Sequence, residues 1–251
     1  MDNKKESPYK LNNINIDENS IRIKNIIMLF TIYLGTSVVV GLILPLLNLT
    51  ITEDTVYNLL GTLNVIVTLI ALILILFYSK KNNLKLFNRE SKGTKNPVRY
   101  ILLVLYTMCA MTLPSVILNY ANNVNANGNA TSANQELLTK ISDNINIYFL
   151  FFMIVILAPI TEEILFRGIP LFFKAKNKKY NSTIFILLRL AIFSLIFGSL
   201  HNPKNLVELL AYSSSGFFMG LSVVLTNRLE TSLVIHILNN LIGFLALVGL
   251  L

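Results

Sequence analysis

Five side chains in the second half of the chain could carry chemistry, and each lies within an apolar stretch of sequence. They are the carboxylates Glu162 and Glu163, the imidazoles His201 and His236, and the amide Asn240. Carboxylates and imidazoles transfer protons or ligate metal ions, and an amide can donate hydrogen bonds. Because polar groups are costly inside an apolar span, we treat these five as candidates for a functional site.

The spacing of the charged residues predicts one ion pair on a helix. Arg167 follows Glu163 by four residues, which places both side chains on one helical face. Glu162 points about 100° away and is not neutralised by that pair. Pro159 lacks a backbone N–H and is expected to bend the helix just before the carboxylates. A purely structural ion pair is the simplest alternative for this segment.

The same spacing recurs at both histidines, which are the only two in the chain. Phe197 precedes His201 by four residues, and Asn240 follows His236 by four. A single histidine in a membrane helix is most often a packing residue. Two histidines, a nearby amide and a paired-carboxylate helix together favour a site. Measured along the helices from the flanking Lys and Arg residues, four positions can lie at a similar depth, about 12–18 Å from one membrane face. They are Glu162, His201, His236 and Asn240.

Membrane-spanning helices must position these residues, because the chain is too apolar for a soluble globule. Hydrophobic residues make up 54% of its 251 positions and charged residues only 14%, against about 25% charged in soluble domains. This composition excludes a cytosolic enzyme, a disordered protein and a secreted disulfide scaffold. The single cysteine, Cys109, permits no intrachain disulfide. We therefore predict an all-α polytopic transmembrane bundle.

Seven apolar stretches each approach the roughly 20 residues that a membrane-spanning helix requires. They cover residues 26–48, 57–78, 99–120, 146–170, 183–202, 206–226 and 232–250. With a cytoplasmic N-terminus, 19 of the 21 Lys and Arg residues fall on the cytoplasmic side, as the positive-inside rule requires. The net charge of +8 therefore indicates cytoplasmic loops rather than binding to nucleic acid.

The same pattern divides the chain into three parts. Residues 1–25 form a polar cytoplasmic tail, and residues 26–134 hold the first three spans and an external Asn-rich loop. Residues 135–251 contain all of the candidate site residues and form the predicted catalytic transmembrane core.

Three motifs, in order along the chain, resemble those of the CAAX-protease and bacteriocin-processing (CPBP) family, also called the Abi family. The motifs are Glu162-Glu163-x₃-Arg167, Phe197-x₃-His201 and His236-x₃-Asn240. The resemblance covers roughly residues 135–245. It implies a bacterial, multi-pass cell-membrane endopeptidase that cleaves a membrane-associated peptide or protein at a cytosol-accessible site. CAAX-like processing, maturation of a bacteriocin or signal-peptide precursor, and self-immunity are the roles that it suggests.

The resemblance also implies a role for each site residue. Glu162 would deprotonate a water molecule that His201 helps to hold, and His236 and Asn240 would donate to the oxyanion. Glu163 and Arg167 would support the helix. We favour a reaction without a metal. The alternative is a Zn²⁺ ion held by Glu162, His201 and His236, although the chain has no His-Glu-x₂-His string.

Two other classes of function remain as alternatives. One is a non-catalytic bacteriocin-immunity or membrane interaction protein, which some family members resemble. The other is a small-solute transporter, which the absence of internal repeats and broken helix pairs disfavours. The expected partners are the lipid bilayer and a peptide or protein substrate. A peptide precursor fits a bacterial protein better than a prenylated tail.

Overall fold

The computed structural model describes residues 53–81, 97–125, 146–172 and 182–250, together with a few isolated positions. The predicted tail at 1–25, nearly all of the first span at 26–48 and most of the Asn-rich loop lie outside the described residues. Within the first span, only positions 28, 30, 31 and 33 are described, and all four are helical.

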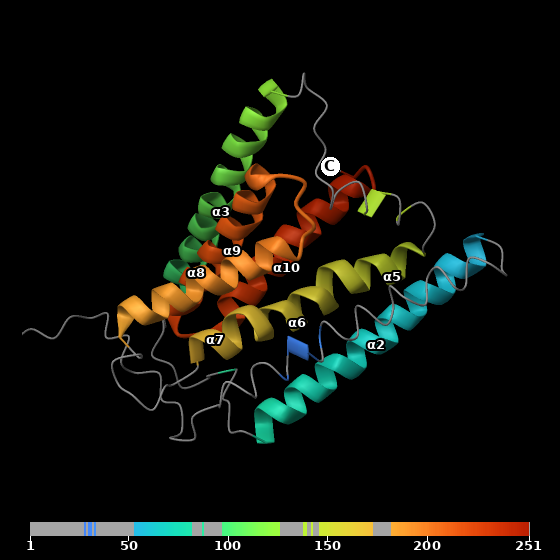
Figure 1. Cartoon of the computed structure of the whole chain (residues 1–251), viewed down its shortest axis with the longest axis horizontal. Helices are drawn as coiled ribbons and strands as arrows, with labels where there is room; N and C mark the ends of the chain where they lie inside the picture. Colours follow the sequence, from blue (N-terminus) through green and yellow to red (C-terminus); the bar gives the residue numbers. More distant parts are fainter. Residues whose placement is uncertain are drawn as a thin grey trace, which may run out of the picture.

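The described residues form helices and no strands, which confirms the predicted all-α bundle (Figure 1). Two long helices come first, α2 (Glu53–Lys81) and α3 (Pro97–Asn125). The chain ends with α8 (Thr183–Ser199), α9 (Leu206–Thr226) and α10 (Leu229–Leu247). Five helices are long and apolar enough to cross a membrane, and α8 is a shorter apolar helix. The protein is therefore a multi-pass membrane protein.

The fourth predicted span is one continuous but irregular helix between α2 and α8. Its five segments are α5 (Ile147–Phe151), η2 (Phe152–Leu157), α6 (Ala158–Glu163), η3 (Ile164–Gly168) and α7 (Ile169–Phe172). The segments η2 and η3 are π-helical. Each π-helical segment ends two residues before a proline, Pro159 or Pro170. A proline ring clashes with the carbonyl four residues earlier, and a wider turn relieves that clash.

Local sequence signals set the ends of the last two helices. Asn205 begins α9 by accepting a hydrogen bond from the Glu208 N–H, and Lys204 donates its backbone N–H to the Glu208 carboxylate. Asn227 ends α9 in the left-handed conformation with φ of 56°. Because only one further residue, Arg228, separates the helices, α10 begins at Leu229, three residues earlier than the predicted boundary at 232.

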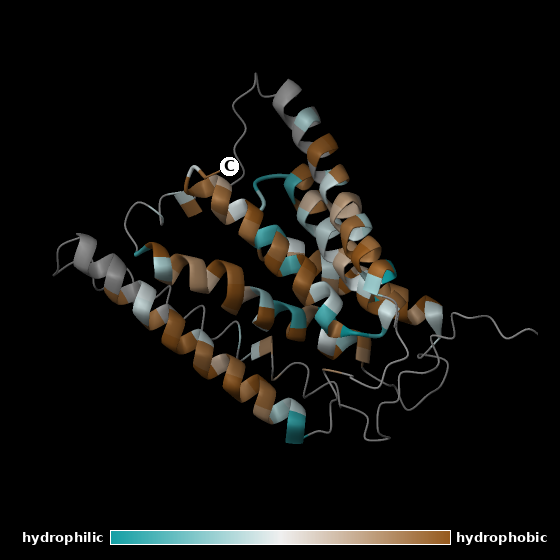
Figure 2. Cartoon of the chain, turned by 180° about the vertical axis from the view of Figure 1, so that it is seen from behind, coloured by the Kyte–Doolittle hydropathy of each residue, from teal (hydrophilic) through white to brown (hydrophobic). Residues whose placement is uncertain are grey.

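Helix α9 lies at the centre of the bundle and packs against α8, α3 and α10. Its contact with α8 is close, because a Cβ at Gly198 would lie 2.9 Å from the Ser213 backbone nitrogen. By contrast, α2 and α3 leave most of their apolar side chains exposed, as expected for surfaces that face lipid. Figure 2 shows hydrophilic residues interrupting α6 and α10 within otherwise apolar helices. Those interruptions contain the candidate site.

Candidate active site

Arg167 is buried at the centre of the site, with a side chain only 1% exposed. Its Nη1 lies 2.7 Å from Glu163 Oε1, as the four-residue spacing predicts. Its Nη2 donates to the Gly216 carbonyl on α9 at 3.2 Å, and its guanidinium carbon lies 4.3 Å from the centre of the Phe197 ring. These contacts compensate the buried cation electrostatically and connect η3 to both α8 and α9.

His236 joins α10 to the paired glutamates. Its Nδ1–H donates to Glu163 Oε1 at 2.8 Å, so that one carboxylate oxygen serves both His236 and Arg167. Its Nε2 lies 3.7 Å from Glu162 Oε2. The hydrogen bond to Glu163 fixes the ring orientation and directs Nε2 toward Glu162, in the way that an outer carboxylate orients a functional histidine.

Glu162 is the more accessible of the two carboxylates. Its side chain is 15% exposed, against 1% for Glu163. Tyr33, from the first apolar stretch, hydrogen-bonds to Glu162 through its hydroxyl group. The Tyr33 ring also meets Phe166 edge to face, with centroids 6.4 Å apart. The first span thus contacts the site, a role for which the sequence provided no signal beyond a tyrosine in an apolar stretch.

Two aromatic rings and one carbonyl hold His201 at the end of α8. Its Nδ1–H donates to the Phe197 carbonyl at 2.8 Å, which leaves Nε2 as the acceptor in the neutral ring. Tyr212 stacks on the imidazole, with centroids 4.7 Å apart and planes 22° apart. The Phe197 ring lies 4.5 Å from His201 and 5.9 Å from His236. His201 is also close enough to Glu162 to interact with it electrostatically.

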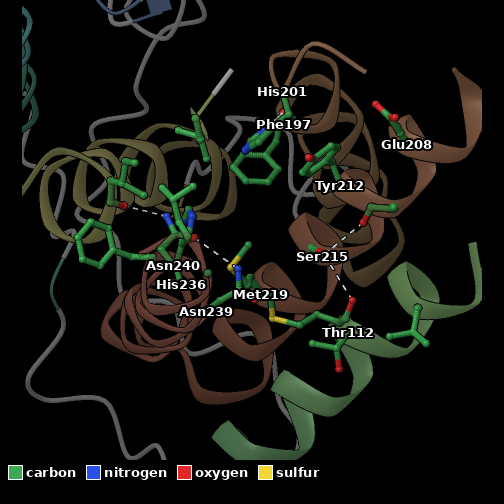
Figure 3. A pocket seen from close by; sticks show the side chains of 18 residues that line it. Thr112, Phe197, His201, Glu208, Tyr212, Ser215, Met219, His236, Asn239 and Asn240 are labelled. Carbon is green, nitrogen blue, oxygen red and sulfur yellow. Dashed lines mark hydrogen bonds between the residues drawn. The ribbon is translucent and has the colours of Figure 1, made fainter. Parts of the chain in front are cut away.

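Some of the candidate residues line a cavity of about 390 Å³ (Figure 3). His201, His236 and Asn240 line it, together with polar side chains from α3 and α9 that include Thr112, Glu208, Tyr212 and Ser215. Apart from Asn239, the remaining lining residues are apolar. An apolar cavity with a few convergent polar groups is the usual form of a binding site for a small molecule or peptide segment.

The structure thus gathers all of the predicted residues, but in two layers. His201, His236 and Asn240 line the cavity, whereas Glu162 does not line it. His236 lines the cavity and also contacts both glutamates, so it connects them to this space. Tyr212, Asn239 and the Gly216 carbonyl are contacts that the motif spacing did not identify.

The metal alternative can be compared with the donor groups that are present. Within the described residues, no three His, Cys, Asp or Glu side chains are arranged so that they could hold a metal ion. The Nδ1 atoms of His201 and His236 are both hydrogen-bonded to protein groups. These bonds leave both Nε2 atoms available for ligation, but a zinc site made of Glu162, His201 and His236 would require the three side chains to move closer together.

Comparisons with known proteins agree with the site. Residues 144–242 match the family model of Rce1-like type II CAAX prenyl endopeptidases, a range that includes all of the candidate residues. The chain is 27% identical over 187 residues to the membrane-embedded CAAX protease MroQ of Staphylococcus aureus (strain USA300). That alignment covers 71% of this chain and 73% of MroQ. No solved structure matches the chain. The three motifs lie together in the structure, and both similarities support a membrane protease of the CPBP family.

Proposed function

We propose that this protein is an intramembrane endopeptidase that uses water activated by Glu162 and His201 to cleave a membrane-associated peptide. The observation that carries this proposal is that His201, His236 and Asn240 line one cavity whose other lining residues are mostly apolar, and that Glu162 Oε2 lies 3.7 Å from His236 Nε2. An apolar peptide segment fits such a cavity, and the polar end meets the backbone of that segment.

In the proposed reaction, Glu162 and His201 prepare the nucleophile. The Nε2 of His201 is the free acceptor of the neutral ring and holds the water. Glu162 accepts a proton from this water as it attacks the peptide carbonyl, and returns the proton to the departing amine. The 15% exposure of Glu162 provides access for one water molecule.

His236 and Asn240 stabilise the negative charge that develops on the carbonyl oxygen. Both side chains line the cavity next to His201. Asn240 donates from its amide, and His236 donates from Nε2 when that atom is protonated. Such donors are most effective in a water-poor site, and the loss of one typically lowers kcat by about 10²- to 10³-fold. Glu163 and Arg167 hold His236 and the helix in position.

The first test compares the secreted and membrane peptides of the host bacterium by mass spectrometry. Cells carrying the wild type should contain cleavage products that are absent with Glu162→Gln or His201→Ala, while each variant reaches the membrane in normal amounts. Glu230→Gln is the matched control, because Glu230 lies at the start of α10, away from the cavity lining.

Two outcomes would count against this proposal. A normal rate of cleavage by the Glu162→Gln variant would show that Glu162 does not take part in the reaction. A Glu162→Gln protein that cleaves nothing but still protects the host from a peptide toxin would support the non-catalytic immunity role instead.

We also propose that the reaction needs no metal ion. Within the described residues, Glu162, His201 and His236 are not arranged to hold a metal ion together, which supports a reaction without a metal. Purified enzyme treated with 1,10-phenanthroline or EDTA, then freed of chelator, should keep its full rate of peptide cleavage. If the chelator abolishes cleavage and added Zn²⁺ restores it, the reaction depends on zinc and this proposal is wrong.

A further inference from the structure

The last π-type hydrogen bond of η2 comes directly before a proline. The Ala158 N–H donates to the Met153 carbonyl, five residues earlier. In the same register, the next donor would be residue 159, paired with the Ile154 carbonyl. Pro159 has no N–H, so the Ile154 carbonyl lacks its backbone donor. Inside a membrane helix such a carbonyl needs another partner, because lipid supplies no hydrogen-bond donor.

Asn240 on α10 supplies that partner. Its Nδ2 donates to the Ile154 carbonyl at 2.9 Å, across 86 residues of sequence. The neighbouring Asn239 donates its own Nδ2 to Asn240 Oδ1 at 3.4 Å. Both ends of the Asn240 amide are thus held, and Figure 3 shows these bonds beside the cavity. One Nδ2 hydrogen of Asn240 remains for a ligand in the cavity that Asn240 lines.

We infer that Pro159 is a positioning residue, which holds the Asn240 amide in place for the oxyanion by leaving the Ile154 carbonyl free to accept from it. The inference rests on the proposed function, in which Asn240 donates to that oxyanion. It gives the proline a role in addition to bending the helix. Pro159 acts only through Ile154 and Asn240 and does not itself touch the substrate.

Pro159→Ala restores a backbone N–H and therefore tests this role. In the π register residue 159 would donate to Ile154, and in the α register Ala158 would do so. In both cases the Ile154 carbonyl gains a backbone donor. That donor then competes with the Asn240 amide for the carbonyl. We expect kcat to fall about tenfold while KM changes less than about twofold, because the contact is used mainly in the transition state.

The assay uses a fluorogenic peptide built around the cleavage site found in the host-peptide comparison. The same substitution is also made in an Asn240→Ala background, where it should cause no further decrease in kcat. This non-additivity identifies an effect that acts through Asn240, whereas a general disturbance of the helix would lower kcat in both backgrounds.

Pro170→Ala is the matched control. Pro170 follows η3 as Pro159 follows η2, since Ile169 donates five residues back to Ile164. Among the described residues, no side chain donates to the equivalent carbonyl, that of Leu165. Pro170→Ala should therefore leave kcat unchanged.

Folding is checked separately by thermal unfolding in detergent. Alanine is the better helix former, by about 3 kcal/mol in a helix interior, so we expect Pro159→Ala to fold. Pro159→Ser restores the same N–H and replaces it if the alanine variant is not recovered. A wild-type kcat in the folded variant, or an equal decrease in both backgrounds, would overturn the inference. If Glu162→Gln is inactive in the same assay, the proposed function still stands.

Discussion

Glu163 Oε1 accepts hydrogen bonds from two basic side chains, Arg167 and His236. It thereby joins η3 to α10, while Arg167 reaches α9 through the Gly216 carbonyl. Since the side chains of Glu163 and Arg167 are each only 1% exposed, neither charge has water as an alternative partner. In the proposed reaction Glu163 is therefore mainly a structural and orienting group, and Glu162 is the carboxylate that takes part in the chemistry.

This assignment predicts a large loss of stability for Glu163→Gln. Breaking a buried ion pair from one side typically costs about 3–5 kcal/mol, because it leaves the partner charge uncompensated. Arg167 would be that charge. Thermal unfolding of the purified protein in detergent, followed by circular dichroism, should show a clearly lower Tm for this variant.

Glu230→Gln provides the comparison for that measurement. Glu230 lies 3.8 Å from Arg228, and the two side chains are 27% and 36% exposed. Exposed pairs contribute about 0–1 kcal/mol, so Tm should hardly change. Equal Tm values for the two variants would show that the Glu163–Arg167 pair is not the structural centre of the site.

At this scale the sequence predicts contacts within a helix better than contacts between helices. The four-residue spacing of Glu163 and Arg167 predicted their pairing, because helical geometry alone brings the two side chains together. The stacking of Tyr212 on His201 and the bond from Asn240 to Ile154 join different helices. Their formation depends on how the helices pack, which spacing along one helix does not specify.

At the scale of elements, the helix that contains Glu162 and Glu163 combines π and α segments. The α6 segment, with both glutamates, lies between η2 and η3, and each π segment shifts the following side chains around the helix axis. Helix positions were predicted to within a few residues from apolar length alone. The π turns were not predicted, although the two prolines that follow them are visible in the sequence.

The close contact of α8 and α9 has a similar explanation. A Cβ at Gly198 would lie 2.9 Å from the Ser213 nitrogen and 3.0 Å from the Leu209 carbonyl oxygen, both backbone atoms that cannot rotate away. Glycine therefore allows the two helices to approach beside Phe197 and His201. A small residue in an apolar helix is consistent with such packing, but the sequence does not reveal which partner helix lies opposite.

At the scale of the whole molecule, the cavity lies toward one end of the bundle. Its lining extends from His236, in the middle of α10, to Leu247 at the end of that helix and Glu208 near the start of α9. The positive-inside rule assigns this end, which also contains Lys204, to the external side. The family resemblance instead implies a site that the cytosol can reach, so the orientation of the chain decides where substrate and water enter.

Single-cysteine labelling can determine this orientation, because Cys109 is the only native cysteine and Cys109→Ser removes it. In that background, Lys204→Cys reports on the cavity end and Lys178→Cys on the opposite loop. From the distribution of Lys and Arg, we expect a membrane-impermeant maleimide to label Lys204→Cys in intact cells and Lys178→Cys only after lysis. The reverse pattern would contradict the predicted orientation and would place the cavity end at the cytosol. The expected orientation follows from the positive-inside rule. It places 19 of the 21 Lys and Arg residues on the cytoplasmic side of the membrane.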